Sequence, residues 1–113
     1  MQHLYSALEE LEGNFGRNTP GGPSAVIASA DKLRLEAHVV LREHGNKGKI
    51  KKNAEEIKVL CIEIQHLCSG WGGVYDIFPG DKRKKITQLI SQITELFKAI
   101  ALELKFEFKE FTT

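Results

Sequence analysis

The residue types that carry chemistry in proteins are few and poorly grouped in this 113-residue sequence. Cys61 and Cys68 stand seven positions apart in a helical pattern, which separates their Cα atoms by about 10 Å. A disulfide spans at most about 7 Å between Cα atoms. His66 lies two residues from Cys68, on the other side of a helix, which argues against a zinc site. We therefore predict buried thiols and no metal or other cofactor.

The acidic residues follow solvated helix faces rather than forming acid–base pairs. Glu103, Glu107 and Glu110 alternate with Lys105 and Lys109, which is typical of an exposed helix surface. We expect His38 to pack at the edge of the core rather than to serve in a catalytic pair. The sequence therefore predicts a protein that is not an enzyme.

The segment 70–80 is the one stretch without a helical pattern, and at this length it exceeds the usual connection between bundle helices. Its "GWGG" has neither the spacing nor the preceding strand of a phosphate-binding loop. Two interpretations stay open. Either its apolar residues fold back to cap the bundle, or Trp71 and Tyr75 remain exposed as anchors for a partner, with Asp76 adding a polar contact.

Basic residues form two clusters although the formal net charge is only +1. The first comprises Lys82, Arg83, Lys84 and Lys85, at the start of a predicted helix, and the second comprises Lys47, Lys49, Lys51 and Lys52. Positive charge near a helix N-terminus costs about 0.3–1 kcal/mol per residue at low salt. We therefore expect the clusters to serve solubility or an acidic partner. In an antiparallel bundle they lie at opposite ends, which argues against one nucleic-acid surface.

Four helical segments are predicted from apolar spacing and from Gly, Pro and Asn. They cover 2–13, 24–45 and 53–70, and the fourth begins with Asp81 as N-cap. Ser24 is the expected N-cap of the second, and Asn53 with Glu56 resembles a capping box that starts the third. Leu35 and Val39 lie off the main stripe of the second helix, so a second neighbour is implied.

The C-terminal residues allow two interpretations. Residues 102–109 alternate apolar and charged side chains like a strand, whereas Ile100, Leu104, Phe108 and Phe111 continue a helical stripe. We favour the helix, because a strand needs a partner strand. Leu102 and Phe106 then form a second apolar face, to be covered by the first helix or by a second copy of the chain in a homodimer.

These patterns predict an all-α fold, a small antiparallel helical bundle of three long helices and a short N-terminal helix that fills the remaining groove. Residues 1–113 form one domain with a long hinge loop at 70–80. No apolar run reaches the roughly 20 residues of a membrane span, and the N-terminal residues do not resemble a signal peptide. We expect a cytoplasmic protein with no membrane partner.

The segment "GWGGVYDIF" resembles small helical bacterial proteins of a family with no assigned activity. The match lies at Gly72, Gly73, Asp76 and Ile77, with amphipathic helices on either side over residues 24–104. Such proteins resemble immunity or accessory proteins of toxin systems, which act by binding. The resemblance implies a binding function and no catalytic residues.

The sequence thus favours a protein-binding module of the immunity type that occludes a toxin. Trp71, Tyr75 and Asp76 would anchor the partner, and Lys82, Arg83, Lys84 and Lys85 would steer an acidic surface toward it. The alternative is a nucleic-acid-associated accessory protein that uses both lysine clusters.

Overall fold

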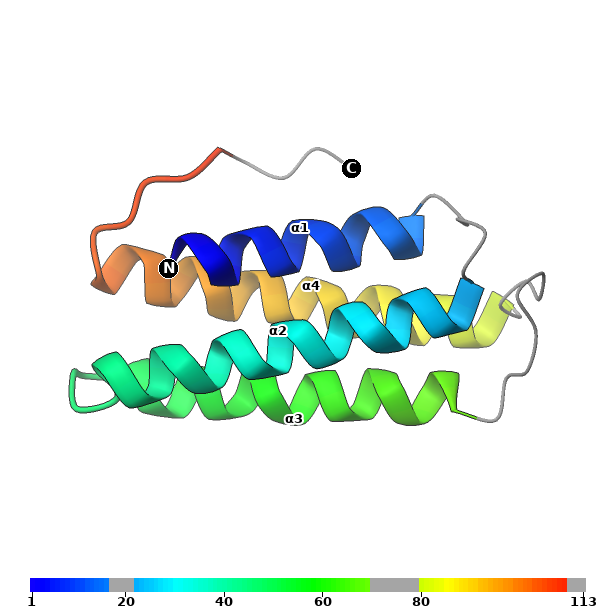
Figure 1. The fold of residues 1–113 in the computed structure, drawn as a ribbon, viewed down its shortest axis with the longest axis horizontal. Coiled ribbons are helices and arrows are strands. Elements are labelled where there is room, and N and C mark those ends of the chain that lie inside the picture. Colours follow the sequence, from blue (N-terminus) through cyan, green and yellow to red (C-terminus); the bar gives the residue numbers. More distant parts are fainter. Residues whose placement is uncertain (17–21, 70–79, 110–113) are drawn as a thin grey trace.

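Four helices make up most of residues 1–16, 22–69 and 80–109, the part of the chain that the computed structural model describes. They are α1 (Gln2–Gly16), α2 (Gly22–His44), α3 (Ile50–Cys68) and α4 (Gly80–Glu103). Consecutive helices run antiparallel, and α1 is the shortest (Figure 1). The prediction of an all-α antiparallel bundle is therefore confirmed.

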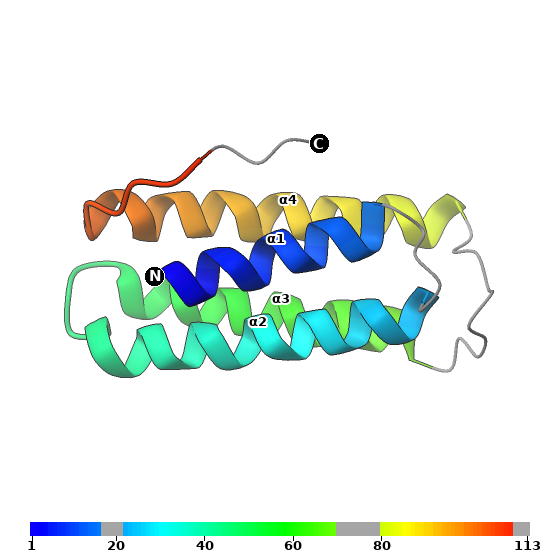
Figure 2. The ribbon, with the colours of Figure 1, turned by 45° about the horizontal axis from the view of Figure 1, so that its top comes forward.

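The helices surround one core. α2 packs against α1 and α3, and α3 packs against α2 and α4, while α1 also touches α4 (Figure 2). Among the described residues, Phe97 is the largest fully buried side chain. Other large, fully buried residues recur at helical spacing, three or four positions apart on α1 and seven apart on the other helices, namely Leu4, Leu8, Leu11, Val26, Leu33, Ile50, Ile57, Ile64, Ile86, Ile93 and Ile100. No helix in the described residues is both long and apolar enough to cross a lipid bilayer.

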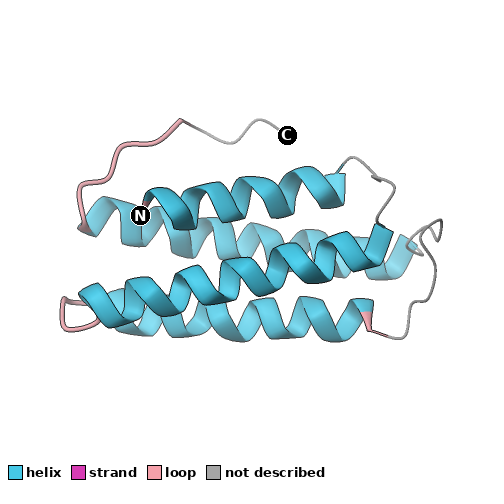
Figure 3. Cartoon of the chain, in the orientation of Figure 1, coloured by secondary structure: helices cyan, strands magenta, loops and turns pink. Residues whose placement is uncertain are grey.

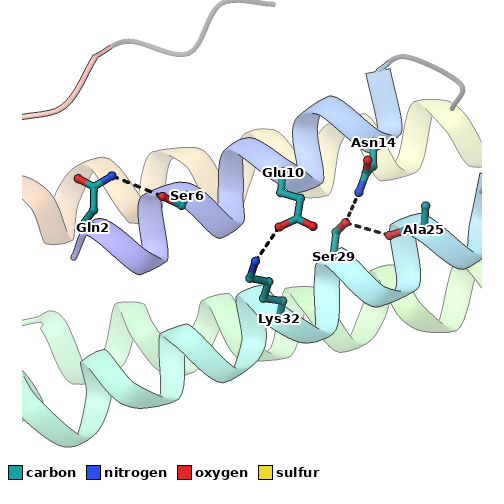
Figure 4. Close-up of polar contacts among 7 residues, drawn as sticks. All are labelled: Gln2, Ser6, Glu10, Asn14, Ala25, Ser29 and Lys32. Atoms are coloured by element: carbon teal, nitrogen blue, oxygen red, sulfur yellow. Dashed lines mark hydrogen bonds and ion pairs between the residues drawn. The ribbon is translucent and has the colours of Figure 1, made fainter.

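Polar contacts connect α1 to α2 (Figure 4). Lys32 Nζ lies 2.9 Å from Glu10 Oε2 on the surface. Deeper in the pair, the Asn14 amide donates to Ser29 Oγ, which donates to the Ala25 carbonyl at 2.9 Å. Ser29 is only 2% exposed, and a buried hydroxyl without hydrogen-bond partners would destabilise the fold. These two bonds supply its partners.

Helix starts and ends differ from the predictions where core residues lie beyond the expected boundary. α1 continues past Gly13 to Gly16, which buries Phe15. α3 begins at Ile50 rather than Asn53, because Ile50 is fully buried and extends the core by one turn. The start of α3 has no side-chain cap. Ser24 and Asp81 lie within the first turns of α2 and α4 rather than before them.

The chain reverses after α4, so the predicted continuation of the helix through Phe108 is wrong (Figure 3). The amide of Lys105 donates to the Leu102 carbonyl and that of Phe106 to the Ala101 carbonyl, with Lys105 at φ 56°. These two bonds form a Schellman motif, which ends a helix. Phe106 and Phe108 then pack on Tyr5 and Phe97, while Leu102 stays 82% exposed.

Candidate functional site

The two cysteines are buried in the core side of α3, as predicted, and both are free thiols. Burial raises the pKa of Cys61 to about 12 and that of Cys68 to about 11. A reactive cysteine needs a lowered pKa, because the thiolate is the nucleophile and the metal ligand. No group of three or more metal-binding side chains occurs in the described residues either. The thiols therefore act as core residues.

His38 is exposed, so its predicted place at the edge of the core is wrong. Ala37 and Val40 fill the core face of α2, and the His38 side chain projects about 100° away from Ala37 around the helix. Its Nδ1 lies 3.1 Å from Lys58 Nζ, which joins the outer surfaces of α2 and α3.

Three members of the cluster Lys82–Lys85 contact other helices. Lys82 Nζ donates to the Leu67 carbonyl at 3.3 Å, and Lys85 Nζ lies 3.9 Å from Glu63 Oε1. The Arg83 guanidinium lies 4.8 Å from the centre of the Phe15 ring. The cluster thus connects the start of α4 with the ends of α3 and α1. Positive charge is favourable beside the carbonyl end of α3, which gives Lys82 a role within the fold.

The predicted anchors Trp71, Tyr75 and Asp76 lie outside the described residues, as do Gly72, Gly73 and Ile77. Their part in binding therefore stays a prediction, and so does the choice between a bundle cap and an exposed loop.

The second basic cluster lies at the other end of the bundle, around the turn between α2 and α3 (Figures 1 and 2). The side chains of Lys47, Lys49, Lys51 and Lys52 are exposed, and within the described part of the chain none of them makes an ion pair or hydrogen bond. Gly48, at φ +45°, lies so close to the Glu103 carboxylate that a Cβ at this position would clash with it. The turn is therefore held against the end of α4.

A group of apolar side chains is exposed on the outer surface of the α2–α3 pair. Leu35 and Val39 of α2 are 51% and 40% exposed, and Val59 and Ile62 of α3 are 61% and 45% exposed. We call these four residues the hairpin face. Each residue lies on the side of its helix that turns away from the buried stripe, since one or two positions separate it from a core residue such as Leu33 or Ile57.

Two contacts between α2 and α3 fix the register of the hairpin face. His38 meets Lys58 near the turn, and the Gln65 amide donates to the Ile27 carbonyl at 3.3 Å farther along. In antiparallel helices these pairs place Leu35 level with Val59 along the two helix axes. Leu35 and Val39 are the residues for which the sequence implied a second neighbour. Val59 and Ile62 were missed, although they also lie off their main stripe.

Comparisons of the chain with family models, with curated proteins and with solved structures find no match.

Proposed function

We propose that this chain is a protein-binding module that acts without catalysis, of the immunity type that neutralises a toxin by occluding it. The observation that supports binding is the hairpin face, where four apolar residues on two adjacent helices are 40–61% exposed. Single exposed apolar residues are ordinary on protein surfaces, whereas several on the outer surface of one helix pair favour an interaction site. The immunity role comes from the sequence resemblance around Gly72 and Gly73.

The size of the hairpin face sets what it contributes to binding. Burying the exposed half of a Val, Leu or Ile side chain is worth about 1 kcal/mol, so the four together contribute about 4 kcal/mol. Association costs at least about 4 kcal/mol of lost motional freedom. The hairpin face is therefore the centre of a larger contact surface, and polar contacts around it must supply the remaining affinity.

Photo-crosslinking in the source cell tests this function. A photoreactive amino acid at Leu35 or Val59 should give discrete protein adducts, whereas the same group at Gln88, exposed on α4, should give none. Leu35→Asp should abolish the adducts formed at Val59, because the charge disrupts an apolar contact. Adducts of equal yield at Gln88, or no adducts at either hairpin position, would contradict the proposal.

A nucleic-acid-associated function is the second candidate, favoured by the exposed Lys47, Lys49, Lys51 and Lys52 with no internal ion pairs in the described residues. Binding through several phosphates weakens steeply as salt rises. Titration of duplex DNA and single-stranded RNA at low and high salt tests this alternative. If neither binds at low salt, the alternative fails.

A further inference from the structure

We infer that the partner of the hairpin face is an amphipathic helix of another protein with a cluster of acidic side chains at one end. This inference rests on the proposed binding function and adds the chemistry of the partner.

Charge along the hairpin face is uneven. Arg42 follows Leu35 by two turns of α2, and Lys52 precedes Val59 by two turns of α3, so both extend the apolar stripes toward the turn. Both side chains are exposed, and within the described residues neither side chain makes an ion pair or hydrogen bond. The exposed acids at this end are Glu43, Glu55 and Glu56, fewer than the exposed cations Arg42, Lys47, Lys49, Lys51 and Lys52. The turn end of the face is therefore basic.

The other end of the face is close to neutral. Asp31 precedes Leu35 by one turn, and its Oδ1 accepts from Arg34 at 2.6 Å. His66 follows Ile62 by one turn on α3 and is exposed. This surface is therefore apolar in its middle and positively charged at one end.

The basic end does not stabilise its own helix. Lys51 and Lys52 lie in the first turn of α3, which contains no acidic residue and has no side-chain cap. Cations there oppose the helix dipole, whereas carboxylates of a partner would be attracted by both the dipole and the lysines. Charge complementarity thus selects an acidic partner for this end.

A helix fits the shape of the face. A third helix can pack across two antiparallel helices and bury one apolar stripe against side chains that both of them expose. From Ile62 to Lys52 the face extends about 15 Å along α3, which corresponds to about three turns of a ligand helix. Apolar residues at i, i+3 or i+4, with acids one or two turns farther on, would match it.

A second copy of the chain matches this face less well. Two-fold pairing would place the basic end of one copy against Asp31 of the other, whose carboxylate is already bound to Arg34. Arg42, Lys51 and Lys52 would then lack acidic partners. Nucleic acid also fits poorly, because the centre of the face is aliphatic and offers no aromatic side chain for stacking.

Synthetic peptides test the partner class with the full chain. Three amphipathic peptides of about 20 residues share one apolar stripe and differ only in end residues, which are Glu, Gln or Lys. We expect the Glu peptide to bind about tenfold tighter than the Gln peptide, and the Lys peptide most weakly. Arg42→Glu with Lys52→Glu should reverse this order. Lys109→Glu, a charge change of the same sign at an exposed side chain beside α1, should leave all three Kd values within about twofold.

Leu35→Asp separates apolar binding from simple charge attraction. It should weaken the Glu and Gln peptides alike by about tenfold, because both use the shared stripe. Equal affinity for the three peptides, no binding by any of them, or tighter binding of duplex DNA than of the Glu peptide would overturn the inference. A dimer in sedimentation that Leu35→Asp dissociates would overturn it in favour of a second copy.

The two proposals fail in different ways. Adducts at Leu35 without a preference for the Glu peptide would remove the acidic partner and leave the binding function. Absence of both adducts and peptide binding would remove both proposals.

Discussion

Lys105 holds a backbone conformation that L-residues rarely adopt. Its φ of 56° lies in the left-handed region, where glycine is usual at the end of a helix. A non-glycine residue there costs about 1 kcal/mol or more. The Lys105 side chain is exposed and makes no ion pair or hydrogen bond within the described residues, so nothing at the side-chain level offsets this cost.

We therefore expect Lys105→Gly to raise the free energy of unfolding by about 0.5–1 kcal/mol, since the strain outweighs the extra freedom of glycine in the unfolded chain. Lys105→Ala is the matched control, because it removes the charge but keeps the strained conformation. Urea denaturation followed by circular dichroism measures both variants. A Gly variant no more stable than the Ala variant would count against strain at this position.

Single residues differed in how well the sequence predicted them. Cys61 and Cys68 were placed correctly, because each occupies the apolar stripe of α3. The role of Lys82 was not predictable, since its acceptor is the carbonyl of Leu67 on another helix. A hydrogen bond to a backbone carbonyl cannot be recognised in the sequence, because the accepting group does not depend on residue type.

At the scale of helices, the spacing of apolar residues predicted the central part of each helix. Capping residues predicted the helix ends poorly. The Asn53–Glu56 pair has the spacing of a capping box, yet α3 starts three residues earlier, where Ile50 reaches the core. The worth of a cap is about 1 kcal/mol, whereas full burial of an isoleucine is worth about 1.5–3 kcal/mol. Tertiary packing therefore overrides the capping signal, and such packing cannot be seen in the local sequence.

The segment after α4 is attached to α1 through Tyr5. The Tyr5 hydroxyl donates to the Lys109 carbonyl at 2.9 Å, beside the rings of Phe106 and Phe108. We expect Tyr5→Phe to lower the free energy of unfolding by about 1 kcal/mol while the ring packing persists. Hydrogen exchange should become faster at residues 106–109 and stay unchanged in α3. Uniformly faster exchange would contradict a local attachment.

For the whole molecule, substitutions on the hairpin face should affect binding, whereas substitutions in the core should affect stability. Leu35 is 51% exposed and Leu33 is fully buried on the same helix. Leu35→Ala should change stability by less than about 0.5 kcal/mol, whereas Leu33→Ala should cost about 2–5 kcal/mol. Thermal and urea denaturation of the two variants measure this difference. A large loss of stability from Leu35→Ala would mean that the hairpin face serves the fold.

The sequence marked Leu35 and Val39 as apolar residues that need a second neighbour, whereas both are exposed in the structure. Leu35 and Val39 were recognised because they lie off the buried stripe of α2, and the same test applied to α3 would have found Val59 and Ile62. That Leu35 lies level with Val59 depends on the register of α2 against α3, which the His38–Lys58 and Gln65–Ile27 contacts reveal. Contacts between helices are a property of the folded chain, so the joint surface could not be read from either helix alone.

The Tyr5–Lys109 bond also bears on the order in which the chain folds. It joins residues 104 positions apart, whereas α2 and α3 are connected by the short turn 45–49. Closing the larger loop from an otherwise unfolded chain costs about 3 kcal/mol more entropy than closing the short one. The α2–α3 pair is thus favoured to form early, and the aromatic contacts between the two ends of the chain complete the bundle late.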